Sequence, residues 1–435
     1  MNDDFDRTIR AALIVPLDGA LPAGLMDGIH GRLLATPQRG PGLVGRLPRW
    51  VPPMRPDTMR LVAVAALTIA VVMGVVVYVG LSRPTSPLVQ SYHGGGAQTG
   101  VMLGPAPVGT PAILHRFDLG GPMDSLSMPI AADGVAIFVS KVGIATAVDL
   151  VTGAERWRVE GLGENTGSPA LVGDVLVIAS LSGTTIGLDL DDGSERWRSS
   201  VGALVTAPLN ADGDTVLVGT AGGLHAVDAA DGARRWSIDT AGAIQRSPAI
   251  ANGVAYVAAE GGQALAIEMA TGTELWRTDA GPGEISTPAI SDDVMYFIVG
   301  PKDETGPHAV VALDTTTGNE LDRWTAPVNE RMFTAAIVDG VIFTTAEDGV
   351  VRRIDTASDS DMQTFFETQR QMGTLASVVD DELFITTAEG AVWSIDRTSG
   401  AQRWRVGVSA DPTMPVVVDG RILVGTATEG LILGR

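Results

Sequence analysis

Apolar residues in the C-terminal three quarters of the chain come in short runs separated by pairs rich in Gly and Asp. One series consists of residues 175–179, a turn at 182–183, residues 185–190 and a second turn at 191–193. Val-, Ile- and Leu-rich runs of this length, bounded by turn residues, are typical of antiparallel strands joined by hairpins. The pattern predicts an all-β region.

The strand pattern recurs with a step of about forty residues. Its clearest marker is an acidic residue followed by Gly and then Trp, each four positions on, as in Asp149, Gly153 and Trp157. The Gly and Trp residues of the recognisable units are Gly153, Gly193, Gly232, Gly272, Gly318 and Gly400, with Trp157, Trp197, Trp236, Trp276, Trp324 and Trp404. Four-stranded units of this length are typical of β-propeller blades.

The two ends of the repeat region predict how the ring closes. Seven units carry the turn, one of them in a degenerate form at Asp355, and the C-terminus adds three further strands without a fourth. Residues 113–119 match an outer strand and precede the first unit. Pairing of these ends would remove free sheet edges and complete an eight-bladed propeller of four-stranded antiparallel blades over 113–435, with seven blades as the alternative.

A different pattern occupies residues 61–81, which carry no charge and lie between Arg60 and Arg83. A run of about 20 such residues matches the thickness of a bilayer, so it predicts one transmembrane helix rather than a buried core helix or a strand. The long segment before it argues against a cleaved signal peptide. Arg-rich residues 46–60 predict a cytoplasmic N-terminus and an extracytoplasmic propeller in the cell membrane.

The remaining N-terminal segments complete the predicted organisation. Residues 1–60 are expected to be a cytoplasmic segment of short helices or disordered chain. Residues 82–112, rich in Pro and Gly, are expected to be a flexible linker that does not pack. Small residues spaced four apart at Ala66, Ala70 and Gly74 are compatible with a weak helix-mediated dimer.

The net charge and the absence of cysteine exclude several classes of function. The net charge is −21, divided between +3 for residues 1–112 and −24 for the rest, which argues against nucleic acid as a partner. The chain has no Cys, which excludes disulfides, thiolate metal sites and cysteine nucleophiles. No phosphate-binding loop, nucleophile elbow or paired-His zinc helix occurs. We therefore predict no catalytic residues, no metal and no cofactor.

The repeated Asp-x3-Gly-x3-Trp turn resembles that of quinoprotein-type, tryptophan-docked β-propellers, which include the PQQ-dependent alcohol dehydrogenases and the outer-membrane assembly factor BamB. The resemblance covers about residues 113–435. It implies that the six Trp and six Gly residues named above dock neighbouring blades. The quinone enzymes commonly hold their cofactor under a pair of adjacent Cys, which this chain lacks, so the resemblance favours a protein without enzymatic activity.

Candidate binding residues lie on the loops that enter the inner strands, because these loops converge on the central channel. The loops before blades four to seven contain Arg246, Glu284, Glu330, Arg331, Met332, Phe333, Arg370 and Met372. The fifth unit is six residues longer than most and gains a loop with Lys302 and His308. Arg beside Met and Phe is typical of protein interfaces.

Three functional hypotheses follow. The first is a membrane-anchored, extracytoplasmic, non-catalytic scaffold that binds protein or a cell-envelope polymer. The second is a transmembrane sensor, resembling anti-sigma regulators, in which residues 1–60 report inward. The third is a PQQ-dependent dehydrogenase.

Overall fold

The computed structural model describes residues 91–435 except for 103, 125–126, 166, 302–305, 328–330, 359–360 and 373–375, and omits the side chains of 334 and 335. The predicted cytoplasmic segment, membrane helix and helix-mediated dimer fall on residues 1–81, outside this part of the chain, and stay predictions. Among the residues that are described, no helix has the length and apolarity needed to cross a membrane.

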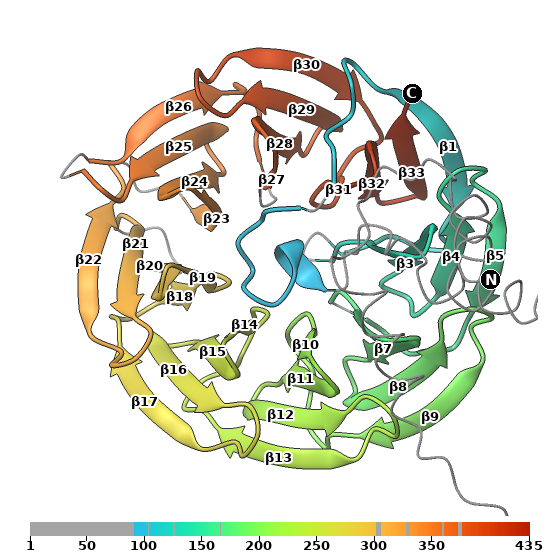
Figure 1. Cartoon of the computed structure of the whole chain (residues 1–435), viewed down its shortest axis with the longest axis horizontal. Coiled ribbons are helices and arrows are strands. Elements are labelled where there is room, and N and C mark those ends of the chain that lie inside the picture. The colour runs from blue at the N-terminus through green and yellow to red at the C-terminus, as the bar shows by residue number, and fades with distance from the viewer. Residues whose placement is uncertain are drawn as a thin grey trace, which may run out of the picture. The chain divides into compact units, whose positions relative to one another are not determined.

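Eight antiparallel sheets are arranged as blades around a central axis, each with its first strand innermost (Figure 1). Blade 1 has β2 (Ile130–Ala132), β3 (Val135–Val139), β4 (Ala145–Asp149) and β5 (Glu155–Val159). Blade 2 has β6 (Ala170–Val172), β7 (Val175–Ala179), β8 (Thr184–Asp189) and β9 (Glu195–Ser200). Blade 3 has β10 (Asn210–Asp212), β11 (Thr215–Gly219), β12 (Gly223–Asp228) and β13 (Arg234–Asp239). Blade 4 has β14 (Ala249–Ala251), β15 (Val254–Ala259), β16 (Gln263–Glu268) and β17 (Glu274–Asp279).

The second half of the ring follows the same order, with one extra strand. Blade 5 has β18 (Glu284–Ile285), β19 (Ala289–Ser291), β20 (Val294–Gly300), β21 (Ala309–Asp314) and β22 (Glu320–Thr325). Blade 6 has β23 (Met332–Val338), β24 (Val341–Ala346), β25 (Val350–Asp355) and β26 (Gln363–Glu367). Blade 7 has β27 (Ser377–Val379), β28 (Glu382–Thr387), β29 (Ala391–Asp396) and β30 (Gln402–Gly407). Blade 8 has β31 (Val416–Val418), β32 (Arg421–Gly425), β33 (Glu429–Gly434) and, from the N-terminal side, β1 (Ala112–Asp118).

Blade 8 closes the ring by joining the two ends of the propeller. Strand β1 pairs antiparallel with β33, from Ala112 opposite Gly434 to Asp118 opposite Glu429. The predicted fold of eight four-stranded blades closed by an N-terminal strand is confirmed, and the seven-bladed alternative is wrong.

The acidic turn of the repeat is stabilised locally. In blade 1, the Asp149 carboxylate accepts hydrogen bonds from the backbone N–H groups of Val151 and Thr152 at 3.0 and 2.9 Å. Gly153, whose φ of +68° suits glycine best, donates its N–H to the Asp149 carbonyl at 2.8 Å. Hydrogen bonds from Arg156 and Thr152 lower the pKa of Asp149 below its ordinary value. Much of the propeller's acidity therefore forms part of its turns.

In each of blades 1 to 4, one Trp contacts the next blade. The Trp157 indole N–H donates to the Leu190 carbonyl of blade 2 at 2.8 Å, and its ring covers Gly193, where an added Cβ would come within 2.8 Å. The same arrangement repeats for three more pairs, Trp197 to Ala229, Trp236 to Met269 and Trp276 to Thr315, each at 2.8 Å. Buried apolar clusters fill the spaces between neighbouring blades.

Trp324 of blade 5 does not take the same position. Trp276 lies opposite Ala266, at the bulge in its strand pair, whereas the corresponding position in blade 5 is held by Asp322 opposite Ala312. Trp324 lies two residues further along, packs on Tyr296 with ring centroids 6.5 Å apart, and donates no hydrogen bond to any described residue. In this unit Gly318 and Trp324 are six residues apart instead of four, and the aromatic ring is moved along the strand; it stays buried in an apolar cluster with residues of blade 6.

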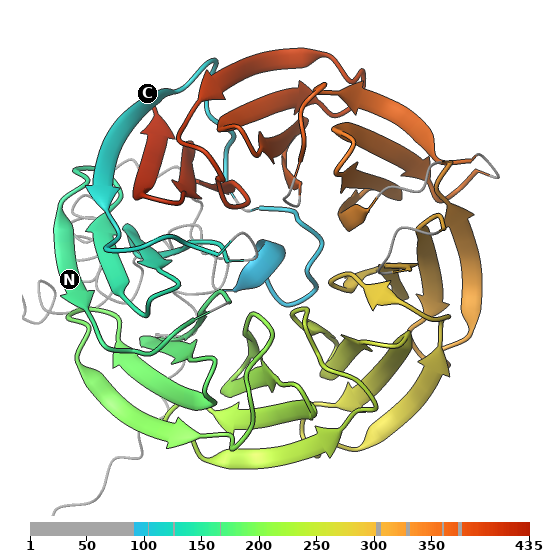
Figure 2. The same ribbon diagram turned by 180° about the vertical axis from the view of Figure 1, so that it is seen from behind.

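The centre of the ring is filled by residues 91–102, which we call the axial segment (Figures 1 and 2). It starts with a short 3-10 turn, η1 (Tyr92–Gly94), and buries Tyr92, His93, Gln98 and Met102. Its backbone bonds to successive inner strands, where Ile250, Ile290, Ile337 and Val378 donate N–H groups to the carbonyls of Gly96, Ala97, Thr99 and Gly100 at 2.6–2.9 Å. The expectation that residues 82–112 do not pack is contradicted over 91–102, because the segment satisfies inner-strand backbone groups that would otherwise face the channel.

Candidate ligand-binding site

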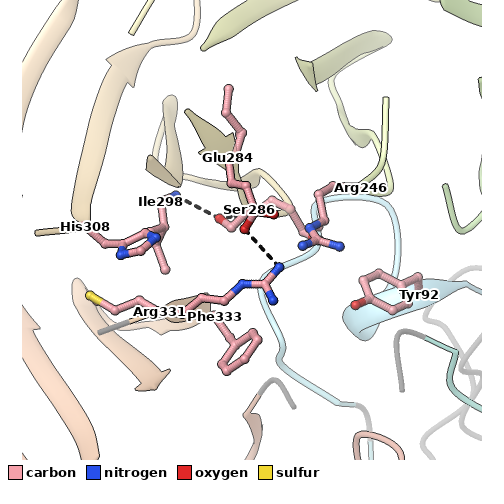
Figure 3. Close-up of a pocket in the computed structure, with 11 residues that line it drawn as sticks. Tyr92, Arg246, Glu284, Ser286, Ile298, His308, Arg331 and Phe333 are labelled. Carbon is pink, nitrogen blue, oxygen red and sulfur yellow. Dashed lines mark hydrogen bonds and ion pairs between the residues drawn. The ribbon is translucent and has the colours of Figure 1, made fainter. Parts of the chain in front are cut away.

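The loops that enter the inner strands and those joining second to third strands lie at one end of the ring, because neighbouring strands are antiparallel. At this end, a pocket of about 380 Å³, including its open mouth, lies between blades 4, 5 and 6 and the axial segment (Figure 3). Its lining is Tyr92, Arg246, Glu284, Ile285, Ser286, Thr287, Ile298, His308, Arg331, Met332 and Phe333. We call it the mouth pocket.

Six of the ten residues predicted from loop composition line this pocket: Arg246, Glu284, His308, Arg331, Met332 and Phe333. Two others are elsewhere. Met372 is fully buried in an apolar cluster, and Arg370 is exposed and pairs with Glu389 at 3.1 Å. The remaining two, Lys302 and Glu330, lie outside the described residues. Tyr92, Ser286 and Thr287 were not predicted.

One side of the pocket is held by a short added strand. Strand β18 pairs with the end of β20, with Glu284 opposite Gly300, and so directs this part of the loop toward the mouth. The Glu284 carboxylate forms an ion pair with the Arg331 guanidinium at 2.9 Å, drawn as a dashed line in Figure 3. Arg331 also lies 3.9 Å from Glu347 and 5.8 Å from the centre of the Phe333 ring. These contacts fix the Arg331 side chain in one position.

Arg246 lies across the pocket from this pair and has a different environment. Its half-buried guanidinium has no carboxylate within ion-pair distance among the described residues. Burial is the largest influence on the pKa of Arg246 and lowers it, as does the nearby Arg331 charge, while Tyr92, Glu284 and Asp124 offset part of this shift. Figure 3 shows the Arg246 and Arg331 guanidinium groups and Tyr92 turned toward a common space.

Tyr92 closes the axial side of the pocket. Burial raises the pKa of its phenol to about 12, partly offset by Arg246 and by a hydrogen bond with Thr287. The ring therefore presents a neutral, polar edge at neutral pH. No composition signal marked this residue, because its Gly-rich neighbourhood predicted an unpacked linker.

The repeat matches a known family along its whole length. The family model described as outer membrane protein assembly factor BamB matches residues 112–204, 141–247, 198–301, 270–361 and 348–433. The chain belongs to this family. No curated protein matches it.

Solved structures of similar fold include both BamB and enzymes. BamB from Moraxella catarrhalis is 18% identical, with a TM-score of 0.60 over 75% of this chain and 98% of that chain. A europium-containing methanol dehydrogenase is 12% identical, with a TM-score of 0.64 over 80% and 98%. A quinohemoprotein alcohol dehydrogenase from Comamonas testosteroni is 14% identical, with a TM-score of 0.64 over 80% and 81%. At these identities the likeness shows the fold.

The dehydrogenases contradict two predictions made from the sequence: that the chain is a membrane-anchored, non-catalytic scaffold, and that it is not an enzyme. The prediction that the chain is not an enzyme depended on the missing cysteine pair and on the absence of a recognisable set of catalytic residues. Because catalytic proteins share this fold, these absences do not decide between enzyme and binding protein. The likeness to the quinoprotein-type propellers and to BamB is confirmed.

A metal-bound quinone, the cofactor implied by the resemblance, does not fit the residues of the axis. Within the described part of the chain, no three His, Asp or Glu side chains converge to hold a metal ion. The centre of the ring is taken up by the axial segment, and the one carboxylate lining the mouth pocket, that of Glu284, is paired with Arg331. We derive no reaction step through such a group.

Proposed function

We propose that the protein binds a partner polypeptide at the mouth pocket. The observation that carries this proposal is the gathering of Arg246, Arg331, Phe333 and Tyr92 around one opening in an otherwise acidic propeller. Arginine and aromatic residues are enriched at the centres of protein interfaces, where they provide most of the binding energy.

The surroundings of the pocket support a surface interaction at this end of the ring. The axial segment lies at the centre of the ring and contributes Tyr92 to the lining of the mouth pocket. A second, smaller pocket lined by Ala243, Gln245, Arg246, Ala258, Glu260, Glu284 and Ile285 adjoins the first and lengthens the surface across blades 4 and 5. The family description, an outer membrane protein assembly factor, is consistent with a polypeptide ligand.

Site-specific cross-linking tests the proposal, and the absence of native Cys makes it direct. A benzophenone attached to Gln245→Cys, beside the mouth pocket, should capture a discrete polypeptide in cells. The matched control is Val151→Cys, a 65% exposed site on a turn at the opposite end of the ring. Capture from Gln245→Cys should disappear when Phe333→Ala is added. Equal capture from both sites, or capture that survives Phe333→Ala, would contradict the proposal.

A further inference from the structure

We propose that the mouth pocket recognises a carboxylate group and that Arg246 is the residue that binds it. This inference rests on the proposed function and names the chemistry of the ligand. The carboxylate belongs either to an Asp or Glu side chain or to the C-terminus of a polypeptide.

The first argument is the contrast between Arg246 and the other arginines. Arg196, Arg235 and Arg403 each pair with two or more carboxylates on turns and strands of their own blades. Arg246 is partly withdrawn from water without such a partner among the described residues. A partly buried cation is costly unless an anion compensates it, so a ligand anion would relieve this cost.

The second argument is the charge balance of the pocket. Glu284 pairs with Arg331 at 2.9 Å and, like Asp124, acts on Arg246 only from beyond ion-pair distance. The Tyr92 phenol is neutral, because burial raises its pKa to about 12. Ser286 is also occupied, since its hydroxyl accepts the Ile298 N–H at 2.8 Å. The pocket therefore offers one cation that no described carboxylate contacts at ion-pair distance.

The third argument is the size and lining of the pocket. The pocket is narrow and open to solvent, so it admits one small group, such as a carboxylate, rather than whole side chains. The Phe333 ring and the buried Met332 provide an apolar surface in the same pocket, with the Phe333 ring beside Arg331. An acidic group next to an apolar residue, in an extended peptide, matches this arrangement.

An array of short peptides in matched sets tests the inference with the full-length protein. Each set has one apolar sequence in three forms: Glu with an amidated C-terminus, Gln with a free C-terminal carboxylate, and Gln with an amidated C-terminus. The wild type should bind at least one carboxylate form about tenfold or more tightly than the form lacking both carboxylates, as expected for loss of a charge-assisted hydrogen bond. The preferred form identifies the source of the carboxylate.

Two substitutions separate this inference from the proposed function. Arg246→Gln should reduce the affinity for the preferred peptide about tenfold and make binding insensitive to removal of the peptide's carboxylate. Arg234→Gln is the matched control, because Arg234 also lacks a carboxylate partner among described residues and bonds only to the Val201 carbonyl, away from the pocket; it should change nothing. Equal binding of all three forms, or no binding of the carboxylate forms, would overturn the inference. Binding that is lost in Phe333→Ala but not in Arg246→Gln would also overturn it, while leaving the proposed function standing.

Discussion

Blades 1 to 4 and blades 5 and 6 follow the same repeat, but only the first group keeps its docking arrangement. In blades 1 to 4, a Trp at the strand bulge donates to the next blade and covers a Gly of that blade. In blade 5, Trp324 lies two residues beyond the bulge, opposite Val310, and in blade 6 the bulge position opposite Val351 is held by Phe366, which has no indole N–H to donate. The mouth pocket is formed by loops entering these two blades and by the loop entering blade 4. The part of the ring that departs from the repeat is thus the part that carries the site.

The arginines of the two regions differ in the same way. Those on the outer strands of blades 2 and 3, Arg196 and Arg235, hold turns together by pairing with Asp residues of their own blade. Arg331 instead bridges two blades at the mouth, and Arg246 has no carboxylate partner among the described residues. This comparison indicates that regular blades use their charges for stability, whereas the mouth keeps charge available for a ligand.

The largest loss of stability should come from adding a side chain at a Gly that is covered by the Trp of the preceding blade. In blade 4, Gly272 (φ +73°) would place a Cβ 2.7 Å from the Trp236 ring, whereas at Gly253 (φ +75°) nothing lies within 4 Å. Gly272→Ala should lower the free energy of unfolding by about 3 to 4 kcal/mol, from steric overlap plus left-handed backbone strain, and Gly253→Ala by about 1 kcal/mol, from strain alone. Chemical denaturation measures both. Equal losses would show that the Trp–Gly contact adds no stability.

Acidic pH should destabilise the axial segment, whose backbone is hydrogen-bonded to inner strands of blade 4 and of blades 5 and 6. Burial lowers the pKa of His93 to about 4 from an ordinary value of 6.5, so the unfolded chain binds an additional proton between these values. Stability should therefore fall as the pH drops from about 6.5 to 4, by about 2 to 3 kcal/mol. His93→Asn suits the positive φ of 53° and does not titrate, so it should flatten this part of the pH profile of unfolding. An unchanged profile would contradict a buried, neutral His93.

Replacing Trp197 should cost more stability than replacing Trp324, because Trp197 donates an indole hydrogen bond to the next blade. Trp197→Phe keeps an aromatic ring but leaves the Ala229 carbonyl without its indole donor, so it should cost about 1 to 2 kcal/mol. Trp324→Phe removes no such bond to a described residue and should cost less than about 1 kcal/mol. Thermal unfolding of both variants gives the comparison, and a larger loss for Trp324→Phe would contradict the different docking described for blade 5.

Much of the fold could be predicted from the sequence, because its information is local and repeated. Strand runs, Gly-Asp turns and the recurring acidic-Gly-Trp turn predicted the blades, and the unmatched strands at the two ends predicted closure by β1 and β33. Six residues of the mouth pocket could be predicted because loops entering inner strands must converge at the axis.

The remaining features depend on contacts between residues that are far apart in the sequence. The axial segment is held mainly by backbone bonds to distant strands, such as Ile250 to Gly96, which leave no side-chain pattern. Tyr92 was missed for that reason, and the shift of Trp324 depended on a bulge register that spacing alone does not give.

The measurement that tests the central claim most directly compares two apolar residues at the same end of the ring, one partly buried and one exposed. Phe333 lies in the mouth pocket, and Leu204, which is 56% exposed, lies on the corresponding loop before blade 3. The dissociation constant of the polypeptide captured from Gln245→Cys should be measured with purified wild type, Phe333→Ala and Leu204→Ala. We predict a loss of about tenfold or more for Phe333→Ala, as for an interface residue near the centre of contact, and no change for Leu204→Ala. Equal affinities for all three proteins, or a loss confined to Leu204→Ala, would contradict the assignment of the binding site to blades 4 to 6.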